Sequence, residues 1–129
     1  MYEIGIIAHF EAAHRLVGNF GPATRLHGHT YRLEVIIRGA RLHDDGTLYD
    51  IGMLQSDVQR LTAMLHYQNL DEVPGLAGLN TTAEQVAHFC WEQLVVGLRG
   101  HDLHSLLVRV WESPHAYAAY EHDIDYGSQ

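Results

Sequence analysis

The chain has 129 residues, one cysteine, no lysine and a formal net charge of −8. Its length predicts a single domain over residues 1–129, and its composition excludes a lysine Schiff base and an intramolecular disulfide. The negative charge argues against binding to nucleic acid or to a membrane, and a lone cysteine without an apolar run of bilayer length favours a cytoplasmic protein.

The N-terminal residues predict two strands joined by a loop. Residues 2–16 are typical of a long strand with His14 near its end, and residues 17–25, "VGNFGPATR", contain two glycines and a proline that indicate a loop. Residues 27–38 alternate with a period of two, which is the pattern of a half-buried strand. One face of this second strand carries His27, His29, Tyr31, Leu33, Val35 and Ile37.

The middle of the chain begins with a turn, "HDDGT", and a short extended piece, "LYDI". From Gly52 to His66, apolar residues recur with the spacing of an amphipathic helix. They are Leu54, Val58, Leu61 and Leu65. Residues 67–80 contain a proline, glycines and asparagines and indicate a loop.

A capping box, Thr81-x-x-Glu84, predicts the start of a second helix, which runs to about Leu98 and is ended by Gly100. Cys90 lies in its apolar stretch "HFCWEQL", which favours a core residue over a nucleophile.

The C-terminal residues predict a closing pair of strands, 104–112 and 115–122, on either side of Ser113-Pro114. The order is therefore two strands, two helices and two strands. This succession predicts an α+β fold.

Three histidines have the spacing of a metal site. On a strand, His27 and His29 point the same way, about 6.5–7 Å apart along the backbone, with only Gly28 between them. If the first two strands pair as a hairpin, His14 supplies a third imidazole, and three protein ligands with an open position are typical of catalytic zinc. The chain has eleven histidines, so spacing alone leaves a histidine-rich surface as the alternative.

The charges are unevenly distributed. Residues 1–41 contain five arginines and three glutamates, a net charge of +2, whereas the remainder carries −10. An anionic small molecule would thus meet positive charge near the histidines, with Arg25 as a candidate substrate-binding residue. Scattered solvated charges are an equally simple interpretation.

Four stretches occur in a distinctive order: "FEAAHRL", "RLHGHTYRLEV", "TTAEQVAHFCWEQL" and a late "WES" followed by "YAAY". They resemble the 6-pyruvoyltetrahydropterin synthase and 6-carboxytetrahydropterin synthase family, over residues 9 to about 120. The resemblance implies the tunnelling fold (T-fold), a four-stranded antiparallel sheet with two helices on one face. In that family, sheets join edge to edge into an oligomeric barrel with active sites between subunits. The resemblance also implies catalytic Zn2+ on His14, His27 and His29.

The same resemblance assigns substrate-binding roles. Glu112 in "VWES" corresponds to the glutamate that anchors the amino-pyrimidine edge of a pterin, where a carboxylate accepts two parallel N–H bonds. Thr81 and Thr82 correspond to a second pterin-contacting segment. The structural alternatives are that Glu112 is an exposed glutamate at a strand end and that the two threonines are helix caps only.

The proton-transfer residues of the family are replaced. Its cysteine corresponds to Ala23, and the Asp-His pair that activates this cysteine corresponds to His66 and Tyr67. Alanine moves no proton, whereas imidazole and phenol groups do, so His66 and Tyr67 are the candidate catalytic residues.

These features favour a zinc-dependent lyase or cyclase of altered chemistry, acting on a pterin or another polyhydroxylated or carbonyl small molecule in a specialised biosynthetic pathway. Two alternatives are an ordinary pterin synthase with a substitute base and a non-catalytic relative that binds zinc and a ligand. The expected partners are a small-molecule substrate and further copies of the chain. Unpaired strand edges favour assembly, in this case as a homo-hexamer (a dimer of trimers) or another T-fold oligomer.

Overall fold

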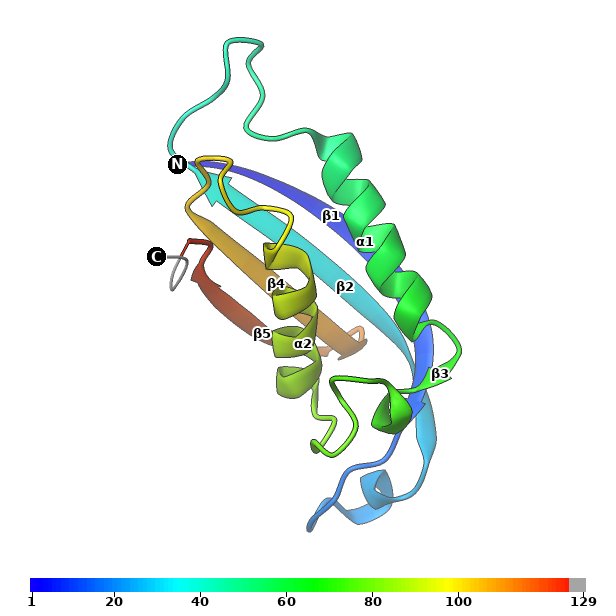
Figure 1. Ribbon diagram of the computed structural model, residues 1–129. Helices are drawn as coiled ribbons and strands as arrows, with labels where there is room; N and C mark the ends of the chain where they lie inside the picture. Colours follow the sequence, from blue (N-terminus) through cyan, green and yellow to red (C-terminus); the bar gives the residue numbers. More distant parts are fainter. Residues whose placement is uncertain (126–129) are drawn as a thin grey trace.

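The computed structural model describes residues 1–125, in which five strands form one sheet (Figure 1). The strands are β1 (Tyr2–His14), β2 (His27–Gly39), β3 (Gln68–Asn69), β4 (Ser105–Ser113) and β5 (Ala116–Asp123). The helices are α1 (Ile51–Leu65) and α2 (Ala83–Val95), with short 3-10 helices η1 (Gly21–Thr24) and η2 (Leu70–Glu72). The strand order is β3-β1-β2-β4-β5.

The four long strands are antiparallel, as the sequence predicts: β1 pairs with β2, β2 with β4, and β4 with β5. The two-residue β3 was not predicted, and it adds a parallel strand beside the end of β1. In the β1–β2 hairpin, His14 lies opposite His27, and Ala12 lies opposite His29. Because side chains alternate along a strand, this register puts all three histidines on one face of the sheet.

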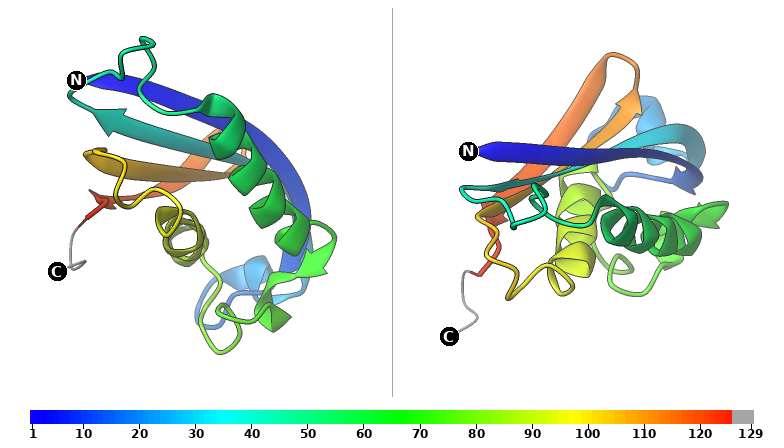
Figure 2. Two further views of the ribbon diagram at one scale, coloured as in Figure 1. Left: turned by 45° about the horizontal axis from the view of Figure 1, so that its top comes forward. Right: turned by 90° about the horizontal axis from the view of Figure 1, so that it is seen from above.

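Both helices cover that same face of the curved sheet (Figure 2). α1 packs on β1, and α2 packs on β4 and β5. The four leucine and valine positions predicted for the apolar stripe of α1 are all buried. The core therefore lies between helices and sheet, and the α+β prediction is confirmed. Within residues 1–125, no helix is long and apolar enough to cross a membrane.

The start of α2 differs from the prediction. Its N-cap is Thr82 and not Thr81, because the Thr82 hydroxyl accepts a hydrogen bond of 3.2 Å from the backbone N–H of Gln85. Both threonines suit a cap by residue type, and the burial of Thr81 decides between them. The helix also ends earlier than predicted, at Val95.

The predicted extended piece before α1 is not a strand. Asp50 instead caps α1, since its side chain accepts from the backbone N–H of Gly52 at 2.8 Å, and the helix begins at Ile51. At the other boundary, β1 ends at His14, two residues before the predicted end at position 16.

Candidate functional site

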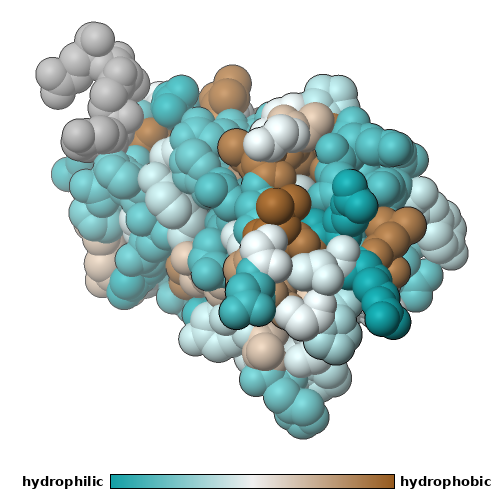
Figure 3. All heavy atoms as spheres, turned by 90° about the horizontal axis from the view of Figure 1, so that it is seen from below, coloured by the Kyte–Doolittle hydropathy of each residue, from teal (hydrophilic) through white to brown (hydrophobic). Residues whose placement is uncertain are grey.

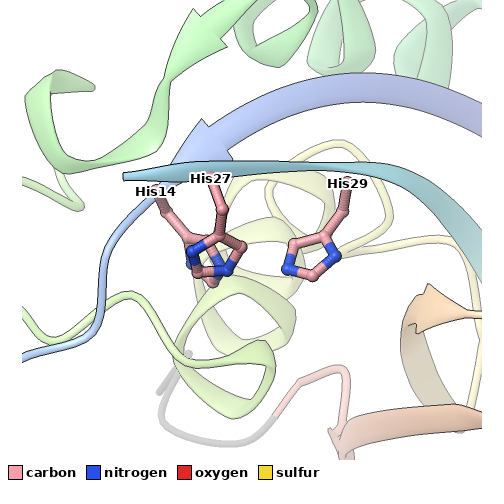
Figure 4. Close-up of side chains that lie close together, drawn as sticks. All are labelled: His14, His27 and His29. Atoms are coloured by element: carbon pink, nitrogen blue, oxygen red, sulfur yellow. The ribbon is translucent and has the colours of Figure 1, made fainter. Parts of the chain in front are cut away.

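Three histidines from two strands converge at one end of the sheet (Figure 4). His14 ends β1, whereas His27 and His29 lie at the start of β2. One ligand atom from each imidazole lies within 4.8 Å of those of the other two. His14 is fully buried, and the other two are half-buried. The structure thus brings together the three imidazoles whose spacing suggested a metal site.

The ring nitrogens of these histidines have different surroundings. Nδ1 of His14 donates to the carbonyl oxygen of Thr81 at 2.8 Å, and Nδ1 of His27 donates to that of Arg25 at 2.7 Å. A carbonyl only accepts, so the hydrogen of both rings sits on Nδ1, and Nε2 keeps its lone pair. Nε2 of His14 and of His29 is buried without a hydrogen-bond partner. Carbonyl-oriented imidazoles with free lone pairs fit a zinc ion.

The surroundings of His29 favour its neutral form. Desolvation by burial lowers its pKa, and the neighbouring His14 and His27 lower it further, against the opposing charge of Glu112. Neutral imidazole is the form that binds a metal. Glu112 lies close by, with Oε2 3.9 Å from His29 Nε2.

Glu112 also connects the histidines to a cavity of about 380 Å³. This cavity lies between β4, β5, the N-terminus of α2 and the loop after β1, and it is lined by Glu112, Thr82, Glu84, Phe20 and Tyr117, among others. Its volume falls in the range of small-molecule sites. Two of the predicted substrate-binding residues, Glu112 and Thr82, therefore share one cavity beside the histidines.

Thr81, the third of these residues, contacts a histidine instead. Besides its carbonyl contact, its Oγ1 lies 3.3 Å from His14 Nδ1 and donates to Asp71 Oδ1 at 2.7 Å. Asp71 Oδ2 accepts from the backbone N–H of Arg15 at 3.0 Å. Sequence reasoning missed Asp71, because it lies in a loop without periodic pattern, 56 residues from Arg15.

Tyr31 is a second residue that sequence reasoning left without a role. It is fully buried two positions after His29, and its hydroxyl has no hydrogen-bond partner. Its ring stacks on Phe10 with centroids 4.9 Å apart and lies 5.3 Å from the ring of His29. Burial raises the pKa of Tyr31, so the hydroxyl stays neutral. The alternation of β2 already placed this residue on the face of the histidines.

The candidate catalytic residues His66 and Tyr67 lie at the edge of the sheet beside β1. The backbone N–H of Glu11 donates to His66 Nδ1 at 3.1 Å, and the backbone N–H of Tyr67 donates to the Glu11 carbonyl at 2.6 Å. Tyr67 is 76% exposed and has a positive φ of 58°. In the described part of the chain, neither side chain forms a hydrogen bond or ring contact with the three histidines.

Three further residues from the sequence analysis lie either in the segment before β2 or in the core. Arg25 orients His27 through its carbonyl, and its own side chain is exposed. Ala23 lies in η1, where it offers no acid or base. Cys90 is fully buried in α2, and burial raises its pKa to about 12. Cys90 is therefore a core residue, as predicted, and it supplies no thiolate near neutral pH.

Sequence comparisons relate the chain to pterin enzymes. Residues 3–123 match the family model described as 6-pyruvoyl tetrahydropterin synthase. The 6-pyruvoyl tetrahydrobiopterin synthase of Dictyostelium discoideum is 33% identical over 102 residues, which cover 70% of this chain and 76% of that protein. The 6-carboxy-5,6,7,8-tetrahydropterin synthase of Haemophilus influenzae is 30% identical over 146 residues, covering 94% of this chain and 99% of that protein.

Solved structures share the fold. The 6-pyruvoyl tetrahydropterin synthase of Caenorhabditis elegans superposes with a TM-score of 0.82 at 24% identity, over 95% of this chain and 96% of that chain. The protein of the same name from Plasmodium falciparum gives a TM-score of 0.78 at 19% identity, over 95% of this chain and 98% of that chain. These likenesses confirm the predicted T-fold for the subunit.

Proposed function

This chain belongs to the 6-pyruvoyl tetrahydropterin synthase family, and from that premise we propose that it is a zinc-dependent lyase or cyclase with altered proton-transfer residues. The proposed substrate is a pterin or another polyhydroxylated or carbonyl small molecule. The observation that carries the proposal is the convergence of His14, His27 and His29 beside Glu112 and its cavity.

The three imidazoles would hold zinc through nitrogens with free lone pairs. When bound, zinc supplies a Lewis acid that polarises a substrate hydroxyl or carbonyl. The carbonyl groups of Thr81 and Arg25 fix the orientation of two of the rings. Ligands held in advance in this way lose little conformational entropy when the metal binds.

Glu112 and the N-terminus of α2 would orient the substrate. A carboxylate accepts two parallel N–H bonds from an amino-pyrimidine edge, and Glu112 lies on the cavity wall that adjoins the histidines. Thr82 lines the same cavity. The exposed guanidinium of Arg25, two residues before His27 along the chain, would attract an anionic substituent.

Proton transfer would differ from that of the family enzymes. Ala23 has no ionisable group, and the pKa of Cys90, about 12, is far from the working range of an acid or base. We propose His66 and Tyr67 as replacements. Their position at an exposed edge suits action on the histidine site of an adjacent subunit.

Assembly into a homo-oligomer, a trimer-based hexamer or another T-fold oligomer, is part of the proposal. The outer edge of β5 pairs with no strand in residues 1–125, and β1 is covered only at its end by β3. The end of the molecule at η1 also shows apolar surface among polar surface (Figure 3). Exposed apolar residues of the loops at this end are Val17, Phe20, Leu26 and Leu79. Open edges and exposed apolar surface both favour contact with further copies.

Two alternatives have specific support. The names of the relatives favour an ordinary pterin synthase with a substitute base. Ala23 and the buried Cys90 favour a non-catalytic protein that binds zinc and a ligand.

One experiment separates these functions. The protein is purified without chelator, its zinc is measured by elemental analysis, and pterin binding and turnover of dihydroneopterin triphosphate are measured on the same sample. We expect one zinc per chain and pterin binding, without production of 6-pyruvoyltetrahydropterin. Production of that compound indicates the ordinary synthase. Absence of zinc contradicts the proposal. The same sample is also assayed with a panel of other pterins and of polyhydroxylated or carbonyl compounds, and zinc and pterin binding without any product from this panel indicates the non-catalytic protein.

A further inference from the structure

Asp71 contacts the surroundings of His14 from two directions. Its Oδ1 accepts the hydroxyl hydrogen of Thr81 at 2.7 Å, and its Oδ2 accepts the backbone N–H of Arg15 at 3.0 Å. Thr81 and His14 are completely buried, whereas Asp71 is half-buried and Arg15 is exposed. Asp71 comes from η2, and it thereby ties the residue after His14 to the segment that precedes α2.

The direction of the Thr81 hydroxyl matters for His14. Both oxygen atoms of Thr81 lie near His14 Nδ1, the carbonyl oxygen at 2.8 Å and Oγ1 at 3.3 Å. While the hydroxyl donates to Asp71, both oxygens act as acceptors toward Nδ1, which must then carry the ring hydrogen. A hydroxyl released from Asp71 can donate to Nδ1, in competition with the bond from Nδ1–H to the Thr81 carbonyl. Where the hydroxyl wins this competition, the ring hydrogen moves to Nε2, the nitrogen that faces the metal position.

We propose that Asp71 is a positioning residue that directs the Thr81 hydroxyl away from His14 and so keeps the lone pair of His14 on Nε2. The inference rests on the proposed function, because the lone pair serves zinc. Partners that orient metal-binding histidines typically change metal affinity by about 10–100-fold when they are removed.

The first test measures zinc affinity by competition with a chromophoric chelator. Asp71→Ala should raise the Kd for zinc about 10-fold or more, because the hydroxyl becomes free to donate to Nδ1. Thr81→Val lacks that hydroxyl and keeps the carbonyl, so its Kd should stay within about threefold of the wild-type value. Glu72→Ala, at the exposed neighbouring position, is the matched control and should match wild type.

The double variant Asp71→Ala/Thr81→Val decides between positioning and a merely structural role. Removing the released hydroxyl should return zinc affinity to within about threefold of Thr81→Val, although the bond to Arg15 is still missing. A double variant as weak as Asp71→Ala overturns the proposal, as does a folded Asp71→Ala protein with wild-type affinity. If Asp71→Ala fails to fold, Asp71→Asn takes its place, since an amide accepts only one of the two bonds.

The second test needs no zinc. Nitrogen-15 NMR of the metal-free protein reports which ring nitrogen of His14 carries the hydrogen. We expect hydrogen on Nδ1 in wild type, a shift toward Nε2 in Asp71→Ala and a return to Nδ1 in the double variant. An unchanged tautomer in Asp71→Ala overturns the inference. If the wild type and the variants show the expected tautomers but the wild type binds no zinc, the proposed function alone is refuted.

Discussion

Buried polar side chains on the two faces of β2 differ in their hydrogen bonding. On the face covered by the helices, His29 keeps a buried nitrogen without a hydrogen-bond partner. On the other face, Glu34 is also buried, yet both of its carboxylate oxygens have partners. Oε1 accepts from Arg32 at 2.9 Å and from Trp111 at 3.1 Å, and Oε2 accepts from Arg109.

This difference distinguishes the proposed binding site from a structural cluster. A buried polar group without a partner costs about 1–3 kcal/mol, and a ligand that binds this group removes the cost. Both carboxylate oxygens of Glu34 already have partners within the protein, so this group offers no free acceptor to a ligand. Among the residues that contact Glu34, Arg109 has one nitrogen, Nε, without a partner, but its guanidinium charge is balanced by the Glu34 carboxylate. We therefore expect substitutions on the helix-covered face to change ligand binding, and those around Glu34 to change stability.

The largest expected effect is on zinc. His14→Ala should weaken zinc binding about 100-fold or more, because one of three ligands is lost from an ion whose binding is worth about 10–16 kcal/mol in protein sites. Elemental analysis after gel filtration measures the loss. His9→Ala is the matched control, since His9 lies on the same strand but is exposed on the opposite face. Zinc retained by His14→Ala would remove His14 from the site.

A substitution at Glu112 tests whether the helix-covered face binds a pterin. Glu112→Gln should weaken pterin binding about 10–100-fold, since hydrogen bonds to a charged group contribute about 1.5–3 kcal/mol, and it should leave one zinc per chain. Isothermal titration calorimetry measures the affinity. Glu121→Gln, at an exposed position of β5, should bind as wild type does. Equal affinity in the two variants would show that Glu112 is not the anchor.

Glu34 tests the structural side. Glu34→Gln should lower the free energy of unfolding by about 2 kcal/mol, because Arg109 and Arg32 lose a buried carboxylate, while zinc content and pterin affinity stay unchanged. Urea denaturation measures the stability. Glu3→Gln is the control, since its ion pair with Arg38 joins two exposed side chains. A loss of zinc in Glu34→Gln would break the division between the two faces.

The smallest effect concerns pH. The pKa of His29 is lowered in the folded state, chiefly by desolvation, so the unfolded chain binds a proton more readily. Stability of the metal-free protein is therefore complete above the ordinary histidine pKa of about 6.5 and is lost as the pH falls below it. Unfolding at pH 7.5 and pH 5.0 should show this loss, and His29→Gln should lose less. His115→Gln, in an exposed turn, controls for removal of an imidazole. An unaltered pH dependence in His29→Gln would contradict the desolvation of His29 as its cause.

Most of the correct predictions came from the periodic spacing of apolar and polar residues along the chain. The alternation of β2 placed His27 and His29 on one face, because a strand has a side-chain period of two wherever it occurs. The stripe of α1 and the α+β order likewise follow from local patterns that tertiary contacts left intact. The resemblance of the motifs to a known family predicted the T-fold, which the solved structures confirm.

Other features depended on contacts between distant segments. Thr81 and Thr82 suit a helix cap equally well by residue type, and only the burial of Thr81 against His14 assigned the cap to Thr82. Asp71 had no signal in its own loop, since its partner Arg15 is 56 residues away. The placement of His66 at a sheet edge depended on a bond to the backbone of β1.

The sequence by itself determined which residue types were present and which of them share a face, because helix and strand periods are local properties of the backbone. The tertiary structure decided which nitrogen of His14 is free, because the carbonyl that accepts its ring hydrogen belongs to Thr81, 67 residues away, and is brought close only by folding. His27 differs, since the carbonyl that accepts its ring hydrogen belongs to Arg25, two residues before it in the chain.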